Sequence, residues 1–137
     1  EYEMRLSAFC NLEICEITPI KISDNTSDSQ IADVLEKEAE LIVKKIPPNY
    51  HVVALCVEGK TFSSEDFAKE ISKNLDMGKS ICFIIGSSYG LSPKIKAMAD
   101  LRLSLSAMTF PHKLFRVMLL EQIYRAFKIN QGSQYHK

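Results

Sequence analysis

The stretch LSLSAMTFPHKLFRVMLLEQIYRAF, residues 103–127, decides how this chain folds. Leucine alternates with serine over 103–106, which predicts a short strand with one buried face. A turn over 107–110 leads to Pro111, which suits the first turn of a helix because its φ is fixed and it has no N–H. Apolar residues then recur at helical spacing. The stretch therefore predicts a strand end, a tight loop and a helix N-terminus, a usual ligand position in an α/β protein.

The rest of the chain alternates predicted strands with predicted helices. Alternation predicts a strand over 12–18, and continuous apolar runs predict two buried strands over 51–57 and 81–85. Amphipathic spacing and capping signals predict the tail of a helix over 1–8, helices over 29–46 and from Ser63 to Gly78, and a short helix over 94–100. A turn is predicted over 58–60 and a polar loop over 19–27. This order predicts one α/β domain over residues 1–137, with a mostly parallel sheet.

Charge gives little indication of a partner. The 137 residues include 17 acidic and 17 basic side chains, and a neutral chain does not indicate general affinity for nucleic acid. The charges are unevenly spread: the segment 24–40 is acidic, whereas 111–137 carries five Lys or Arg against Glu121 alone. The basic end could meet an anionic partner, although composition alone favours a solvated helix face.

The cysteines and the hydropathy exclude other classes. None of the four cysteines, Cys10, Cys15, Cys56 and Cys82, belongs to a CxxC pair. Free thiols in a reducing cytoplasm are therefore expected, rather than disulfides or a metal site. No run of about 18 apolar residues occurs, so no membrane span is expected.

Three groups of residues could carry chemistry. The loop from Gly86 to Gly90 follows a buried strand, and its small residues would let backbone N–H groups approach a ligand. Its spacing fits neither a dinucleotide nor a P-loop fingerprint, so ligand binding and a simple turn stay equally open. His112 and Arg116 lie one helical turn apart, a pair that is more often structural. The terminal residues 135–137 carry a tyrosine and a histidine, although chain ends are usually frayed.

With these residues placed, the sequence resembles the RlmH family of SPOUT-class methyltransferases. The similarity covers essentially the whole chain. Its most specific parts are LCVEGKTFSSEDFA (55–68), FIIGSSYGLSP (83–93), LSLSAMTFPHKLFRVMLLEQIYRAFKI (103–129) and the terminal YHK (135–137).

The resemblance implies an α/β SPOUT-type fold with helices on both faces of the sheet, a C-terminal trefoil knot and a homodimer. It implies S-adenosyl-L-methionine as cofactor, and methyl transfer to N3 of a pseudouridine in 23S rRNA of the assembled 70S ribosome. Its cofactor-binding residues would be Leu55, Gly86, Leu105, Ser106, Ala107, Met108, Thr109 and Phe110. The donor is a sulfonium, so positioning and removal of the N3 proton matter more than acid catalysis.

Carried over to this chain, the catalytic residues would be His136, Arg116 and Tyr135. His136 would accept the proton, Arg116 would hold phosphate or the developing anion, and Tyr135 would stack on the base. The chain departs from the family in two ways: Ser87 replaces a second glycine, and a family strand and loop before residue 1 have no counterpart. The first alternative to a methyltransferase is an inactive ribosome-associated binding protein. A more distant alternative is a hydrolase that uses His112 or His136.

Overall fold

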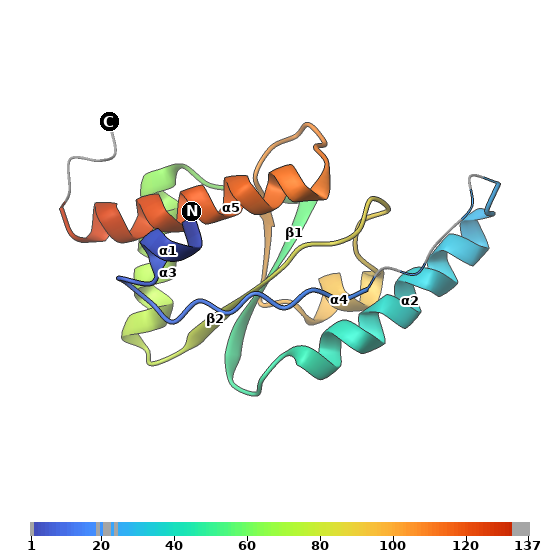
Figure 1. Ribbon diagram of the computed structural model, residues 1–137, viewed down its shortest axis with the longest axis horizontal. Helices are drawn as coiled ribbons and strands as arrows, with labels where there is room; N and C mark the ends of the chain where they lie inside the picture. Colours follow the sequence, from blue (N-terminus) through green and yellow to red (C-terminus); the bar gives the residue numbers. More distant parts are fainter. Residues whose placement is uncertain (1, 19, 21–22, 24, 133–137) are drawn as a thin grey trace.

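A computed structural model of the chain describes residues 2–18, 20, 23 and 25–132. Its centre is a parallel sheet of three strands in the order β2-β1-β3. The strands are β1 (Tyr50–Thr61), β2 (Ser80–Ile84) and β3 (Leu101–Ser104). The predicted parallel α/β arrangement is confirmed, and all three strands end toward the same side of the molecule (Figure 1).

Helices cover both faces of the sheet, as predicted. They are α1 (Tyr2–Leu6), α2 (Asp28–Lys45), α3 (Ser64–Asp76), α4 (Pro93–Met98) and α5 (His112–Asn130). Helices α1, α3 and α5 pack together on one side, whereas α2 and α4 lie on the other (Figure 1). Serine hydroxyls cap three of these helices: those of Ser27, Ser63 and Ser92 accept N–H bonds at the starts of α2, α3 and α4. The cap at Ser63 was predicted.

Alternate residues of β1 face the two helical layers. Val53 belongs to a core with Phe67 and Ile71 of α3 and the buried residues of α5. Its neighbours Val52 and Ala54 belong to a second core under α2 and α4. Both faces of β1 are therefore buried, which explains why its first half is a continuous apolar run.

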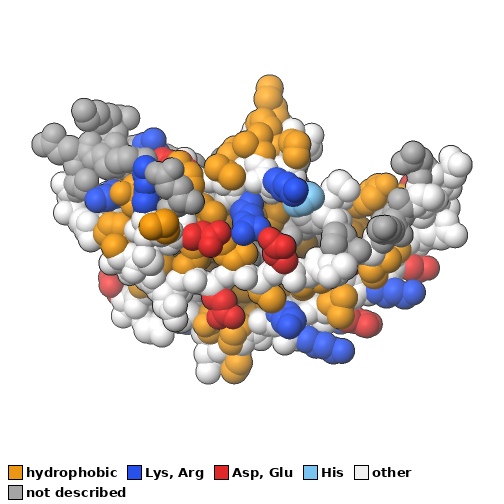
Figure 2. Space-filling model, in the orientation of Figure 1, with side chains coloured by type: hydrophobic (Ala, Val, Ile, Leu, Met, Phe, Trp, Pro, Cys, Tyr) orange, Lys and Arg blue, Asp and Glu red, His pale blue; other side chains and the backbone are white. Residues whose placement is uncertain are grey.

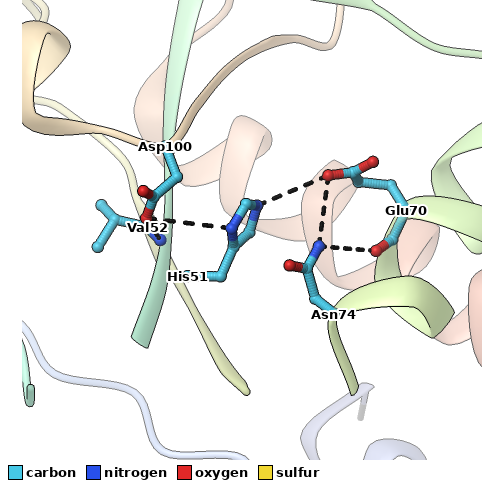
Figure 3. Close-up of polar contacts among 5 residues, drawn as sticks. All are labelled: His51, Val52, Glu70, Asn74 and Asp100. Carbon is cyan, nitrogen blue, oxygen red and sulfur yellow. Dashed lines mark hydrogen bonds and ion pairs between the residues drawn. The ribbon is translucent and has the colours of Figure 1, made fainter. Parts of the chain in front are cut away.

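A polar network fastens the amino-terminal ends of β1 and β3 to α3 (Figure 3). Asp100 Oδ2 accepts the N–H of Val52 at 2.8 Å, and the Asp100 N–H donates to the Val52 carbonyl at 2.8 Å. His51 lies between two carboxylates, with Nδ1 4.0 Å from Asp100 and Nε2 3.6 Å from Glu70. Asn74 Nδ2 donates to the carbonyl and the carboxylate of Glu70. His51 Nε2 is buried and has no hydrogen bond to any described residue.

The strand predicted over 12–18 is wrong. The segment is extended, but it belongs to no strand of the described structure. Its apolar residues Leu12, Ile14 and Ile17 are half-buried, whereas the residues between them are exposed. Partial burial of apolar side chains does not supply the neighbouring backbone that a strand needs for its ladder.

The turn predicted over 58–60 is also wrong, because β1 continues through it to Thr61. The pairing with β3 does change there: Leu55 and Lys60 both align with Leu103, so the intervening residues form a bulge. A Cβ on Gly59 would lie 2.7 Å from the backbone of Arg102. Glycine at 59 thus allows two backbones to approach, rather than reversing the chain.

The third strand begins and ends two residues earlier than predicted, at Leu101 and Ser104. Side-chain bonds turn the backbone after it. Ser104 Oγ donates to the Ser106 carbonyl at 3.0 Å, and Ser106 Oγ accepts the Met108 N–H at 3.0 Å. Serine hydroxyls that bond nearby backbone favour a turn over continued strand. The loop that leads to α5 therefore begins at residue 105.

Candidate cofactor site

A cavity of about 420 Å³ lies at the carboxyl ends of β2 and β3, beside the bulge of β1. Four segments form its walls: the bulge of β1, the loop after β2, helix α4 and the β3–α5 loop with the start of α5. Its lining residues are 55–58, 85–88, 90–91, Lys96, Leu103, Leu105, Ser106, 109–112 and Phe115. The carboxyl ends of parallel strands are the usual ligand position in open α/β sheets.

The cavity brings together most of the residues that were predicted to bind the cofactor. Those that line it are Leu55, Gly86, Leu105, Ser106, Thr109 and Phe110. Ala107 and Met108 do not line it. They are exposed, and Met108 has 72% of its surface accessible at the tip of the β3–α5 loop. Figure 2 shows hydrophobic side chains gathered on this projecting loop. The geometry groups these residues, and their roles in binding stay a prediction.

Gly86 is required by the loop itself. A Cβ on this residue would lie 2.5 Å from the Gly90 carbonyl oxygen, closer than real side chains approach a backbone. The loop folds back on itself, and the Gly90 N–H donates to the Ser87 carbonyl at 2.8 Å. Sequence reasoning expected the space above Gly86 to admit a ligand, but part of that space belongs to Gly90. The compact loop then forms one wall of the cavity.

An ion pair closes the wall between β1 and α4. Lys96 Nζ lies 2.5 Å from Glu58 Oε1, and both residues line the cavity. The hydrogen bond from Lys96 is the main reason why the pKa of Glu58 is lowered below its ordinary value. Sequence reasoning missed both residues. They are 38 positions apart, and only the bulge and α4 bring them together.

Cys56 presents a half-buried thiol to the cavity. Burial, followed by the nearby charge of Glu58, raises the pKa of this thiol above its ordinary value. Cys56 is therefore a neutral thiol near pH 7 rather than a nucleophilic thiolate. No group of three metal-binding side chains occurs among the residues that the structure describes.

The structure separates the two polar residues of α5 that the sequence placed one turn apart. His112, the first residue of the helix, lines the cavity. Arg116 does not: its guanidinium donates to Glu16 Oε1 at 2.6 Å and lies 3.6 Å from Glu3. Arg116 thus holds the extended N-terminal segment against α5 in this structure. Tyr135 and His136, the other predicted catalytic residues, lie outside the described residues.

The volume and the lining of the cavity are compatible with S-adenosyl-L-methionine. Its volume is in the range of about 300–1,000 Å³ that is typical of small-molecule sites. Apolar side chains that suit an adenine ring, such as Leu55, Ile85, Leu91 and Phe110, line it together with the hydroxyls of Ser106 and Thr109. The backbone of the loop after β2 adds N–H and carbonyl groups.

No helix in the described ranges is both long and apolar enough to span a bilayer.

Comparison with known proteins identifies the family. The family model described as "Predicted SPOUT methyltransferase" matches residues 1–136. The chain is 49% identical to Ribosomal RNA large subunit methyltransferase H 1 of Clostridium perfringens strain SM101 over 138 residues, which is 100% of this chain and 87% of that protein. With the same coverage it is 48% identical to Ribosomal RNA large subunit methyltransferase H of Clostridioides difficile strain 630 and 49% identical to that of Streptococcus thermophilus strain LMD-9. The chain therefore belongs to the SPOUT methyltransferase family.

Proposed function

We propose that the protein is an S-adenosyl-L-methionine-dependent rRNA methyltransferase, and that its target is N3 of a pseudouridine in 23S rRNA of the assembled 70S ribosome. The observation that carries this proposal is the cavity, which joins Leu55 at the bulge of β1 with Gly86 after β2 and the loop after β3. Relatives of nearly equal length that are named as large-subunit rRNA methyltransferases support the substrate class. In the cell, the single domain of residues 1–137 would act in the cytoplasm.

The residues of the cavity would act mainly by positioning. When bound, the cofactor supplies an electrophilic methyl group on a sulfonium sulfur. The loop after β2 and the segment from Leu105 to Phe110 would fix its orientation, and the apolar walls would exclude water. Holding two reactants in line removes much of the entropic barrier to their reaction. The acceptor nitrogen also has to lose a proton, which requires a group that is basic near neutral pH.

The substrate side would be formed by the C-terminal residues. The resemblance assigns base stacking to Tyr135 and proton acceptance to His136. Arg116 would bind a phosphate or the uracil anion in exchange for its present partners, Glu16 and Glu3. Its bond to Glu16 is exposed, and exposed ion pairs contribute only about 0–1 kcal/mol, so an RNA phosphate could replace the carboxylate.

A homodimer would bring a second copy to α5. Leu114 and Val117 lie three residues apart on this helix and are 43% and 49% exposed. A second cavity, of about 330 Å³, reaches Val117 and is also lined by Met118, Phe62 and Leu103 among others. An apolar strip next to a hollow suits a partner helix. A dimer through this face would let the tail of one subunit reach the cofactor cavity of the other. The C-terminal trefoil knot that the resemblance implies also stays a prediction.

Methyl transfer to ribosomes tests the function. Purified protein, cofactor with a labelled methyl group and 70S particles that lack the modification should give labelled N3-methylpseudouridine in the 23S rRNA, identified by mass spectrometry of nucleosides. A naked rRNA hairpin should be a poor substrate, because the neutral chain offers little non-specific attraction for phosphate. Cofactor binding and ribosome binding without transfer would indicate an inactive binding protein instead.

A further inference from the structure

Four titratable side chains line the cofactor cavity of the described chain: Cys56, Glu58, Lys96 and His112. Methylation of N3 needs one group nearby that can take a proton at neutral pH. The structure describes the surroundings of each of the four, so they can be compared as proton acceptors.

Three of the four are poor acceptors. Glu58 accepts a hydrogen bond from Lys96 at 2.5 Å, which lowers its pKa and makes it a weaker base. Lys96 is the cation of that pair, and its ammonium group has no free lone pair with which to accept a proton. Cys56 is half-buried, and burial raises the pKa of its thiol, so near pH 7 it is protonated.

His112 is different in its position and its partners. It is the first residue of α5, it is exposed at the cavity, and neither of its ring nitrogens bonds to any residue that the structure describes. Phe110 and Phe115, which precede and follow His112 in the sequence, also line the cavity. Their ring centroids lie 5.6 Å apart, edge to face. An imidazole ordinarily changes its charge between about pH 5 and 8, which suits a general base at neutral pH.

We propose that His112 is a catalytic residue of this site and accepts the N3 proton of the uracil ring. The inference rests on the proposed methyltransferase function. In the step, the N3 lone pair forms the new bond to the methyl carbon, and the bond between that carbon and sulfur breaks with its electron pair left on sulfur. The N3 proton moves to a ring nitrogen of His112, from which it is lost to water. The tail histidine, His136, would then contact the substrate without being the acceptor.

Kinetics of two histidine variants in the full chain separate the two acceptors. His112→Ala should lower the rate of methyl transfer to 70S particles by about 10²–10⁴, the usual worth of a general base. It should leave the affinity for S-adenosylhomocysteine, measured by calorimetry, within a few-fold. Added imidazole should restore part of the rate of His112→Ala in proportion to the fraction of free base, and it should not restore His136→Ala. Rescue of His136→Ala alone, or rescue of neither variant, would overturn the proposal.

A second measurement does not depend on activity. The Hε1 resonance of His112, assigned by its loss in His112→Gln, should shift when S-adenosylhomocysteine is added, whereas that of His51, at the opposite ends of the strands, should stay in place. An unmoved His112 resonance with saturated ligand would remove His112 from the site. Wild-type protein that transfers no methyl group to ribosomes would refute the proposed function, and the resonance would still decide whether His112 faces the ligand.

Discussion

Gly86 and Gly90 are packed so closely that a Cβ on Gly86 would lie 2.5 Å from the Gly90 carbonyl oxygen. We expect Gly86→Ala to open the loop after β2 and to weaken S-adenosyl-L-methionine binding at least about tenfold, or about 1.4 kcal/mol. Calorimetry measures the affinity. Gly78→Ala is the control: φ is +76° there, no atom lies within 4 Å of the added Cβ, and the residue follows α3, away from the cavity. It should cost stability and leave the affinity unchanged. Equal effects of the two variants on binding would exclude the loop from the site.

The thiol of Cys56 should report occupancy of the cavity. Burial raises the pKa values of Cys10, Cys56 and Cys82, so at pH 7.5 few of these thiols are thiolates. Iodoacetamide should therefore modify the exposed Cys15 first, as resolved by peptide mass spectrometry. Excess S-adenosylhomocysteine should slow the labelling of Cys56 further and leave Cys82, which does not line the cavity, unaffected. Equal protection of both cysteines would indicate that the ligand stabilises the whole fold and does not shield the Cys56 thiol directly.

The ion pair between Glu58 and Lys96 should make the cavity wall sensitive to acid. The pKa of Glu58 is lower in the folded state than in the unfolded state, so its ion pair contributes its full stability above the unfolded-state pKa. This stability is lost as the pH falls through the folded-state pKa. Both side chains are partly exposed, so the loss of stability in Glu58→Gln should be small, on the order of 0.5 kcal/mol. Urea unfolding at pH 7 and at pH 3 measures it: the difference between wild type and variant should shrink as the pH falls. A difference that persists in acid would mean that Glu58 acts through packing instead of charge.

The carboxylate of Asp100 should be worth more than an exposed ion pair, because it accepts the Val52 N–H inside the sheet. Asp100→Ala removes this acceptor at the start of β1 and should lower the free energy of unfolding by about 1–3 kcal/mol. Asp100→Asn keeps an oxygen acceptor and should lose less. Denaturant titration of the two variants gives the comparison. Identical losses would show that the charge beside His51, and not the bond to Val52, is what stabilises the fold.

The proposed tail function can be tested in a mixed dimer. One subunit lacks residues 135–137 and keeps its cofactor site, and the other keeps its tail and carries Gly86→Val. If a tail serves the partner's cavity, the intact cavity receives the intact tail and activity remains. If a tail serves its own subunit, neither cavity is complete and the dimer is inactive. The assay is methyl transfer to 70S particles by affinity-purified mixed dimers, and the homodimer without tails should be slower than wild type by orders of magnitude. An inactive mixed dimer of confirmed composition would falsify transfer across the interface.

Local patterns in the sequence determined most of the elements. The apolar runs of 51–57 and 81–85, the cap at Ser63 and the proline before α5 depend on interactions within one turn or one strand, so they can be recognised without the fold. The alternation over 12–18 and the glycine at 59 were misread for the opposite reason. A strand exists only beside a partner backbone, and the purpose of Gly59 is visible only once Arg102 lies against it.

The chemistry of the site divides in the same way. Sequence motifs were sufficient to name the family and to select Leu55, Gly86 and the segment after Leu105, because these motifs are specific even when their positions in space are unknown. Only the tertiary structure decided that Lys96 pairs with Glu58 and that Glu16 holds Arg116. It also decided that His112 lines the cavity whereas Arg116, one helical turn away, does not. These partners are tens of residues apart, and which of them meet depends on how the bulge of β1 and the helices α4 and α5 pack on the sheet. Charge and proton affinity depend on neighbours, so the sequence specified the groups and the packing specified what each can do.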